Sequence, residues 1–178
     1  MSIMTATGRG AQVGVLIKNA EALERFETID TLIVDKTGTL TEGKPRLVAV
    51  TAEPGFEQTE LLRLAASLER GSEHPLAEAN VRGAEERGLE LASAEDFEAI
   101  TGKGVIGRVA DKPVALGNLA LITDMGLDGR SLSEQANVRR DDGETVMFVV
   151  VGGQIAGLVA VADPIKESTP DAIRSLHE

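Results

Sequence analysis

The chain has 178 residues, of which 42% are hydrophobic, enough for one folded domain or a domain with part of a second. Eighteen Lys and Arg against 29 Asp and Glu give a formal charge of −11, which argues against a nucleic-acid partner and against docking on anionic lipid. Cysteine is absent and histidine occurs twice, which excludes disulfides, thiol catalysis and a Cys- or His-rich metal site. No stretch is long and apolar enough to cross a membrane, and residues 1–10 lack the apolar core of a signal peptide. Taken alone, the chain is expected to be soluble and intracellular.

The first half of the chain alternates between helical and extended patterns. Apolar residues with helical spacing predict a helix over Gly8–Glu27. The apolar run Thr31–Asp35 predicts a buried strand that ends in a loop, and Arg46–Ala52 is expected to form another strand. Apolar residues recur at i, i+3, i+4 and i+7 over Leu61–Leu68, which predicts a helix. A second helix over His74–Arg87, with proline in its first turn, would complete a helical hairpin.

From about Ala94 the hydrophobic period changes to two, which is typical of strands. Gly104–Ala110 and Lys112–Gly117 are predicted to pair as a hairpin. Thr145–Val151 and Gln154–Ala162 are predicted to pair in the same way across two glycines. The remaining predicted elements are three helices: Leu119–Met125, Ser131–Arg140 and Ser168–His177.

These patterns predict an inserted domain. Residues 44–162 form a self-contained α+β unit with an antiparallel sheet and helices on it. Residues 1–43 and 163–178 are interpreted as two pieces of a second domain, interrupted between a strand and a helix. The breakers Gly43–Pro45 and Asp163–Pro164 are candidate hinges between the two domains.

The segment Asp35-Lys-Thr-Gly-Thr-Leu-Thr41 carries the chemistry. Asp35 lies at the carboxyl end of a predicted buried strand, where α/β folds bind ligands. Lys36 adds a positive charge and Thr37 a hydroxyl, while Gly38 allows a tight turn whose amides can face a phosphate. This set suits a carboxylate nucleophile that attacks a phosphoryl group in the presence of Mg²⁺. A strand end with turn residues is the plainer interpretation, but so long a string of specified residues rarely recurs by chance.

The same segment resembles the phosphorylation motif of P-type ATPases. The resemblance implies that Asp35 becomes an aspartyl phosphate and that Asp35 and Thr37 contribute to a Mg²⁺ site. It also implies an α/β protein in which an α+β nucleotide-binding domain, residues 44–162, is inserted in a haloacid-dehalogenase-like Rossmann-type phosphorylation domain. The expected boundaries are residues 1–43 for the stalk and first part of the phosphorylation domain, and 163–178 for the return into it.

A second signature, Ser72-Glu-His-Pro-Leu76, resembles a motif of the heavy-metal-transporting branch of the family. In that branch the histidine orients the adenine of ATP, so the resemblance gives this role to His74. An acidic residue five positions earlier falls on Glu69. The overall pattern is most similar to copper-exporting pumps. A histidine that only caps a helix is the plainer interpretation of His74 taken without its neighbours.

Further segments resemble parts of the ATP pocket or the return into the phosphorylation domain. Two glycines spaced by one residue before a strand let a backbone approach a flat ligand closely. Alone, each of these segments would indicate no more than a turn. The nucleotide-binding residues implied by the resemblance are Gly102, Gly104, Val105, Gly117, Asn118, Asp163 and Lys166, beside Glu69 and His74.

Two departures from the family pattern bear on the function. Asn80 falls on the inner face of its helix, where family members usually have an aliphatic residue, and a buried asparagine without partners costs about 1–3 kcal/mol. The family's Thr-Gly-Asp and Gly-Asp-Gly-x-Asn-Asp segments, the second of which supplies a Mg²⁺ ligand, do not occur in the 178 residues. The chain is therefore expected to bind ATP with little or no turnover.

The resemblance implies an ATP-binding and phosphorylation-site fragment of a copper-exporting pump, with Asp35, Lys36 and Thr37 as catalytic residues. It implies ATP and Mg²⁺ as cofactors, a transported metal bound elsewhere in the parent, and a place on the cytoplasmic side of a membrane. One alternative is a phosphatase of the haloacid-dehalogenase type, although Thr37 stands where such enzymes usually have a second Asp. The other alternative is a non-catalytic nucleotide-binding module with the helical hairpin as a partner surface.

Overall fold

The computed structural model describes residues 3–19, 21, 24–25 and 28–177. The chain divides into two units, Met1–Asp35 and Lys36–Glu178, which are described separately. No helix in the described ranges is long and apolar enough to span a membrane.

The first unit differs from the sequence prediction. One helix, α1, covers Ile3–Gln12, and residues 15–19 have no regular secondary structure. Residues 21 and 24–25, within the predicted helix Gly8–Glu27, are helical. The helix α1 ends because Gly14 adopts a φ of +82°, a left-handed conformation that terminates helices. Part of the predicted helix, residues 20, 22–23 and 26–27, lies outside the described residues.

The predicted buried strand Thr31–Asp35 is also wrong in this structure. The segment is exposed and has no regular secondary structure, and Ile33 is 93% exposed. A strand needs the backbone of a neighbour to satisfy its own N–H and C=O groups, and the described residues provide none for this segment.

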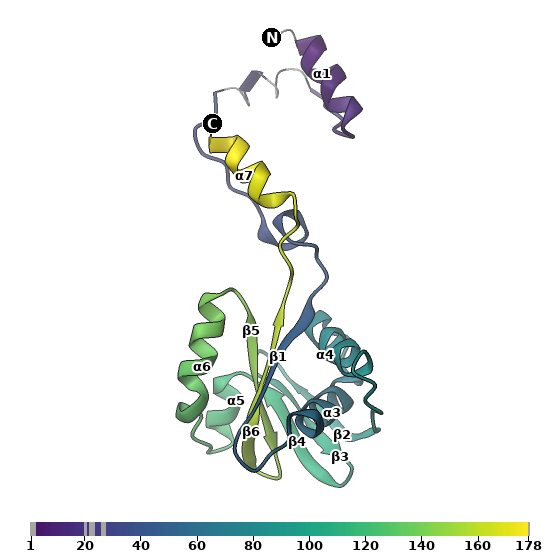
Figure 1. Cartoon of the computed structure of the whole chain (residues 1–178), viewed down its shortest axis with the longest axis vertical. Helices are drawn as coiled ribbons and strands as arrows, with labels where there is room; N and C mark the ends of the chain where they lie inside the picture. Colours follow the sequence, from purple (N-terminus) through teal and green to yellow (C-terminus); the bar gives the residue numbers. More distant parts are fainter. Residues whose placement is uncertain (1–2, 20, 22–23, 26–27, 178) are drawn as a thin grey trace. The chain divides into compact units, whose positions relative to one another are not determined.

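The second unit is built on a six-stranded antiparallel sheet in the order β1-β6-β5-β4-β3-β2 (Figure 1). The strands cover Arg46–Ala52 (β1), Ala94–Ile100 (β2), Gly104–Val109 (β3), Lys112–Gly117 (β4), Thr145–Val151 (β5) and Gln154–Ala162 (β6). The two predicted hairpins are confirmed as β3–β4 and β5–β6. The antiparallel sheet expected for this region is therefore confirmed, with β2 added at one edge and β1 at the other.

Helices cover both faces of the sheet, and the alternation of side chains along each strand explains why. On β5, Val149 packs against α3 (Gln58–Glu69), whereas its neighbour Phe148 packs on the other face against α5 (Leu119–Asp124) and α6 (Arg130–Asp141). The helix α4 (Pro75–Glu85) packs antiparallel beside α3 and completes the predicted helical hairpin.

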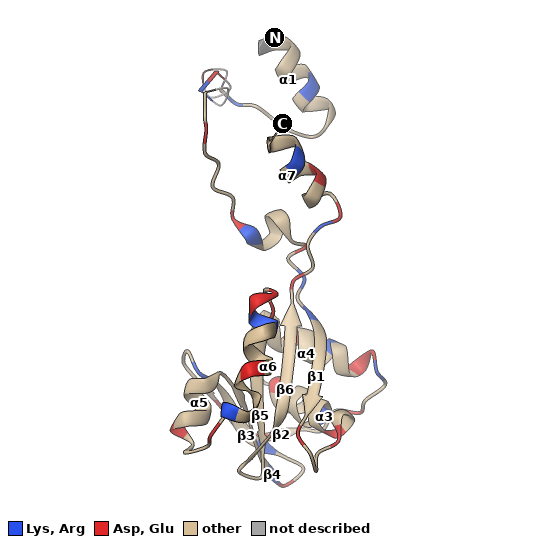
Figure 2. Cartoon of the chain, turned by 60° about the vertical axis from the view of Figure 1, so that its left-hand side comes forward, with Lys and Arg blue, Asp and Glu red and all other residues tan. Residues whose placement is uncertain are grey.

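Two connecting segments join this sheet to the helix α7 (Thr169–His177) and to a wide turn at Lys36–Leu40. The turn is closed by the Thr41 N–H, which donates to the Lys36 carbonyl oxygen at 3.2 Å. The segments run next to each other (Figures 1 and 2), because the Glu42 N–H donates to the Pro164 carbonyl and the Lys166 N–H donates to the Leu40 carbonyl.

Candidate functional site: a pocket at the mouth of the helical hairpin

A pocket of about 480 Å³ lies where the α3–α4 hairpin meets one end of the sheet. Its walls come from the end of α3, the start of α4, the β2–β3 turn, the end of β4 and the start of β5. The structure brings together in this pocket seven residues that the sequence assigned to nucleotide binding: Glu69, His74, Gly102, Gly104, Val105, Gly117 and Asn118.

His74 is held as the N-cap of α4 at the rim of the pocket. Its Nδ1 atom accepts the Leu76 N–H at 3.2 Å, and the following proline begins the helix at its first position. Because Nδ1 acts as an acceptor, the proton of the neutral ring lies on Nε2. His74 therefore caps α4, and the same hydrogen bond fixes the ring so that Nε2 remains available as a donor.

Glu69 closes α3 and is only 5% exposed, although it lines the pocket. Burial raises the pKa of the Glu69 carboxyl to about 8, and the hydrogen bond from Asn80 acts in the opposite direction. The Asn80 Nδ2 group donates to Glu69 Oε2 at 2.6 Å. Near neutral pH, Glu69 is therefore mainly a neutral carboxylic acid that can donate a proton in a hydrogen bond as well as accept one.

Asn80 itself is fully buried on the inner face of α4, as its spacing predicted. The structure gives it one partner, Glu69, for its amide nitrogen. Its Oδ1 atom is the one buried side-chain polar atom in the described ranges that has no hydrogen-bond partner.

The glycines around the pocket serve two different needs. Gly104 and Gly117 face each other across β3 and β4, and a Cβ at Gly104 would come within 2.2 Å of the Leu116 carbonyl oxygen. A Cβ at Gly117 would come within 2.3 Å of the Lys103 carbonyl oxygen, so the sheet itself requires both glycines. A Cβ at Gly102 would meet nothing within 4 Å, although its φ of +72° favours glycine.

Asn118 ties the β2–β3 turn to the start of α5. Its Oδ1 atom caps the helix by accepting the Ala120 and Leu121 N–H groups, at 3.0 and 3.2 Å. Its Nδ2 group donates to the Gly102 carbonyl oxygen at 2.8 Å. The side chain therefore holds the glycine turn of the pocket in place from outside the turn.

Some pocket residues were not identified from the sequence. Lys103 lies between the two glycines of the turn and pairs with Asp124 of α5. Thr145, Val146 and Met147 reach the pocket from the start of β5. The Gly-Lys-Gly string could have identified Lys103 as a pocket residue. The β5 residues reach the pocket because β5 pairs with β4, and two helices separate these strands in the chain, so no local sequence pattern indicates their position.

Asp163 and Lys166 do not line this pocket. The Asp163 carboxylate accepts hydrogen bonds from the Thr41 hydroxyl (2.5 Å) and from the Gly43 (3.2 Å) and Lys44 (3.0 Å) N–H groups. The Lys166 ammonium donates to the Gly38 carbonyl oxygen at 2.7 Å. Both residues therefore bind the Asp35–Thr41 segment and the candidate hinge that follows it, and their assignment to nucleotide binding stays a prediction.

Asp35, Lys36 and Thr37 are all exposed. Asp35 and Thr37 offer oxygen atoms, the ligand type that Mg²⁺ prefers. However, no group of three His, Asp or Glu side chains that could hold a metal occurs within the described residues. These two residues can supply only part of a magnesium ligand set.

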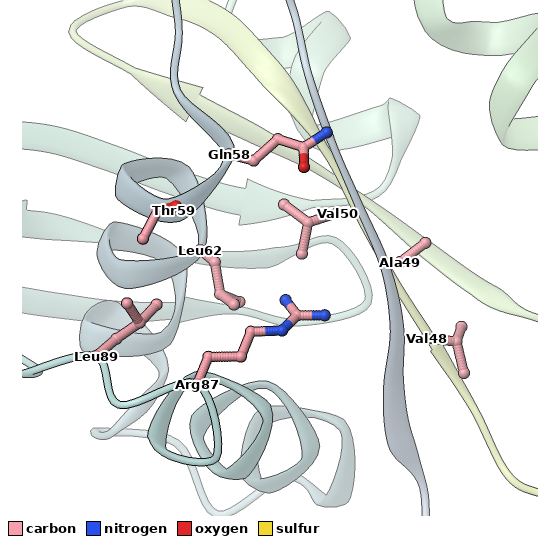
Figure 3. Close-up of a pocket in the computed structure, with 8 residues that line it drawn as sticks. All are labelled: Val48, Ala49, Val50, Gln58, Thr59, Leu62, Arg87 and Leu89. Carbon is pink, nitrogen blue, oxygen red and sulfur yellow. The ribbon is translucent and has the colours of Figure 1, made fainter.

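A separate pocket of about 490 Å³ lies between β1 and the α3–α4 hairpin (Figure 3). The Arg87 guanidinium extends across it toward Val50 and Ala49, and Leu62 also lines it. Apart from Arg87, Gln58 and Thr59, the lining is apolar, and no residue of the sequence motifs takes part.

Comparisons with known proteins identify the family of the chain. A family model described as haloacid dehalogenase-like hydrolase matches residues 29–178. A copper-transporting P-type ATPase of Rhizobium leguminosarum bv. viciae is 62% identical over all 178 residues. A copper-exporting P-type ATPase of Legionella pneumophila subsp. pneumophila is 53% identical, again over the whole chain. The chain covers 21% and 24% of these two relatives.

A crystal structure of a zinc-transporting PIB-type ATPase in the E2.Pi state has a similar fold, with a TM-score of 0.79 and 33% identity. The similarity covers 98% of this chain and 28% of that one. The predicted resemblance to heavy-metal-transporting pumps, with copper exporters the most similar, is confirmed. The chain belongs to the haloacid dehalogenase-like hydrolase family, and along its whole length it is similar to metal-transporting P-type ATPases.

Proposed function

We propose that the chain is the ATP-binding and phosphorylation-site segment of an ATP-driven heavy-metal pump of the copper-exporting type. The observation that carries this proposal is the meeting of Glu69, His74, the Gly102 turn and Asn118 in one pocket. The full-length relatives that match are named as copper-transporting or copper-exporting pumps, and this supports copper as the cargo. In such a pump, this segment would lie on the cytoplasmic side of the membrane.

The pocket suits a purine base. His74 offers an Nε2–H donor, and Glu69 offers a carboxyl group in a mainly apolar wall. The exposed side of Gly102 leaves room for a flat ring to approach the backbone. Lys103 lies in the same turn, where its positive charge would favour the phosphates of a bound nucleotide.

The chemical step in this proposal takes place at Asp35. A carboxylate oxygen of Asp35 attacks the γ-phosphorus of ATP, a new O–P bond forms, and the bond from phosphorus to the ADP oxygen breaks. Asp35 and Thr37 would supply oxygen ligands to Mg²⁺, and the bound ion would neutralise charge on the phosphates. Lys36 offsets the negative charge that develops on the transferred group. The product would be an aspartyl phosphate and ADP.

The connecting segments would allow the base-binding pocket to approach Asp35. With the proposed domain boundaries at 43/44 and 162/163, a hinge would lie at Gly43–Pro45 and Asp163–Pro164. The Asp163 carboxylate supports this, because it links the two segments by accepting the Gly43 and Lys44 N–H groups. Because the partial magnesium ligand set leaves phosphoryl transfer inefficient, we propose that the chain binds ATP with little turnover.

Calorimetric titration of the chain with ATP tests the base pocket. The two histidines provide a matched pair of variants, because His74 lines the pocket and His177 lies on the exposed helix α7. We expect His74→Ala to weaken ATP binding about tenfold, since a hydrogen bond to the base is lost, and His177→Ala to leave it unchanged. Equal affinities in all three proteins would overturn the assignment of the pocket.

A further inference from the structure

The buried pair Asn80 and Glu69 connects the inside of the helical hairpin to the wall of the pocket. Asn80 is fully buried, and its side chain reaches across from α4 to the last residue of α3. The Asn80 Nδ2 group donates to Glu69 Oε2 at 2.6 Å. Neither side chain has another hydrogen-bond partner among the described residues, so this one contact fixes how the carboxyl group is turned.

The contact makes the two oxygen atoms of Glu69 unequal. Oε2 already accepts a hydrogen bond, which favours it as the carbonyl-like oxygen of a neutral carboxyl group. Oε1 has no hydrogen-bond partner in the described part of the chain. It is not fully enclosed, because the one fully enclosed side-chain polar atom without a partner in that part is Asn80 Oδ1. The proton of neutral Glu69 is therefore expected on Oε1, the oxygen that is free to meet a ligand.

The neutral form is the relevant one near pH 7, because burial raises the pKa of Glu69 to about 8. The titratable groups that line the same pocket are His74, at the start of α4, and Lys103, in the β2–β3 turn. Lys103 is paired with Asp124. Burial raises the pKa of Glu69, and the Asn80 hydrogen bond opposes this shift.

We propose that Asn80 is a positioning residue for the nucleotide pocket: it holds Glu69 Oε2 so that Oε1 presents an O–H donor to a ring nitrogen of the bound purine. This inference rests on the proposed function, because it takes the ligand of the pocket to be ATP. A purine ring nitrogen with a lone pair accepts such a donor, and a carboxylate cannot supply one. ATP affinity should therefore fall as the pH rises through the pKa of Glu69.

Replacement of Asn80 by leucine, which has the same branching of heavy atoms and no polar atom, tests the proposal without ATP. The hydrogen bond from Asn80 lowers the pKa of Glu69, so its loss should raise that pKa above the wild-type value of about 8. Carbon-13 NMR of the Glu69 carboxyl group in the ligand-free chain measures both values. An unchanged pKa in a folded Asn80→Leu chain would overturn the role of Asn80.

Titration with ATP at pH 6.5, 7.5 and 9 gives the second readout. We expect Asn80→Leu to weaken ATP binding about five- to tenfold at pH 6.5, because the Asn80 hydrogen bond no longer orients the protonated carboxyl group of Glu69. The difference in ATP affinity between wild-type and Asn80→Leu should be smaller at pH 9, where wild-type Glu69 has lost its proton. In a Glu69→Ala background, the substitution at Asn80 should have no further effect on affinity.

Ser67 supplies the matched control for damage to the fold. It is buried on α3 two residues before Glu69, where its hydroxyl donates to the Arg63 carbonyl and accepts the Ala92 N–H, and it does not line the pocket. Ser67→Ala should lower stability and leave ATP affinity and its pH profile unchanged.

The outcomes separate the two proposals. If the wild-type chain shows no saturable ATP binding, the proposed function fails. If wild-type binds and Asn80→Leu binds with the same affinity and pH profile, the positioning role fails while the proposed function stands. A loss in Asn80→Leu that is the same at every pH, or one that Ser67→Ala reproduces, would also reject the positioning role.

Discussion

Replacing Glu69 with glutamine is predicted to stabilise the folded chain, most strongly above neutral pH. Burial raises the pKa of Glu69 from 4.5 to about 8, so between these values the folded chain holds a proton that the unfolded chain has lost. Stability therefore falls by about 1.4 kcal/mol for each pH unit in this window. The accumulated cost is about 3 kcal/mol at pH 7 and about 5 kcal/mol above pH 8. Glutamine has the same shape, still accepts the Asn80 N–H and carries no such cost.

Urea unfolding followed by circular dichroism measures this difference, since the chain has no tryptophan or tyrosine for a strong fluorescence signal. The two proteins should be equally stable near pH 4.5 and should diverge up to about pH 8, where the free energy of unfolding of Glu69→Gln would be higher by about 5 kcal/mol. Glu73→Gln, at an exposed position near the same turn, should change little at any pH. A Glu69→Gln chain no more stable than wild-type at pH 8 would refute the reasoning.

Two further substitutions test the geometry around the pocket and at the hinge. Gly104→Ala should lower the free energy of unfolding in urea by about 3 kcal/mol or more, because its Cβ would come within 2.2 Å of the Leu116 carbonyl oxygen. Gly102→Ala should lower it by about 1 kcal/mol, because a Cβ there meets open space. Equal losses in the two variants would contradict this distinction. Asp163→Ala should speed hydrogen exchange of the Gly43 and Lys44 amides, which donate to its carboxylate, and should leave the protection of the β5–β6 pair unchanged. Unchanged exchange at both amides would show that the carboxylate does not hold the hinge.

The parts of the fold that depend on neighbouring residues could be predicted from the sequence. Alternating apolar residues and a Gly-Gly turn were enough for the β5–β6 hairpin, and helical spacing with Pro75 was enough for α4. The family motifs identified the pocket residues His74 and Gly102, which the structure brings to the same pocket. Local propensity and local motifs carry this information because the contacts that they describe are close in sequence.

Contacts distant in sequence could not be predicted in the same way. The pairing of β4 with β5 brings Thr145 and Met147 to the pocket, and two helices separate these strands in the chain. Thr31–Asp35 has the composition of a strand but no partner in the described residues, so its intrinsic preference is not realised. The position of Asn80 on an inner face was predictable, whereas its bond to Glu69 depends on how two helices pack.

The measurement that tests the central claim most directly is a titration of the isotope-labelled chain with ATP, followed by NMR of the backbone amides and the His74 ring. The account predicts saturable shifts at Gly102, Gly104 and Asn118 and at the ring of His74, with little change at Arg87 in the separate pocket beside β1. No shifts from a folded sample, or shifts centred on Arg87, would contradict the assignment of the nucleotide pocket.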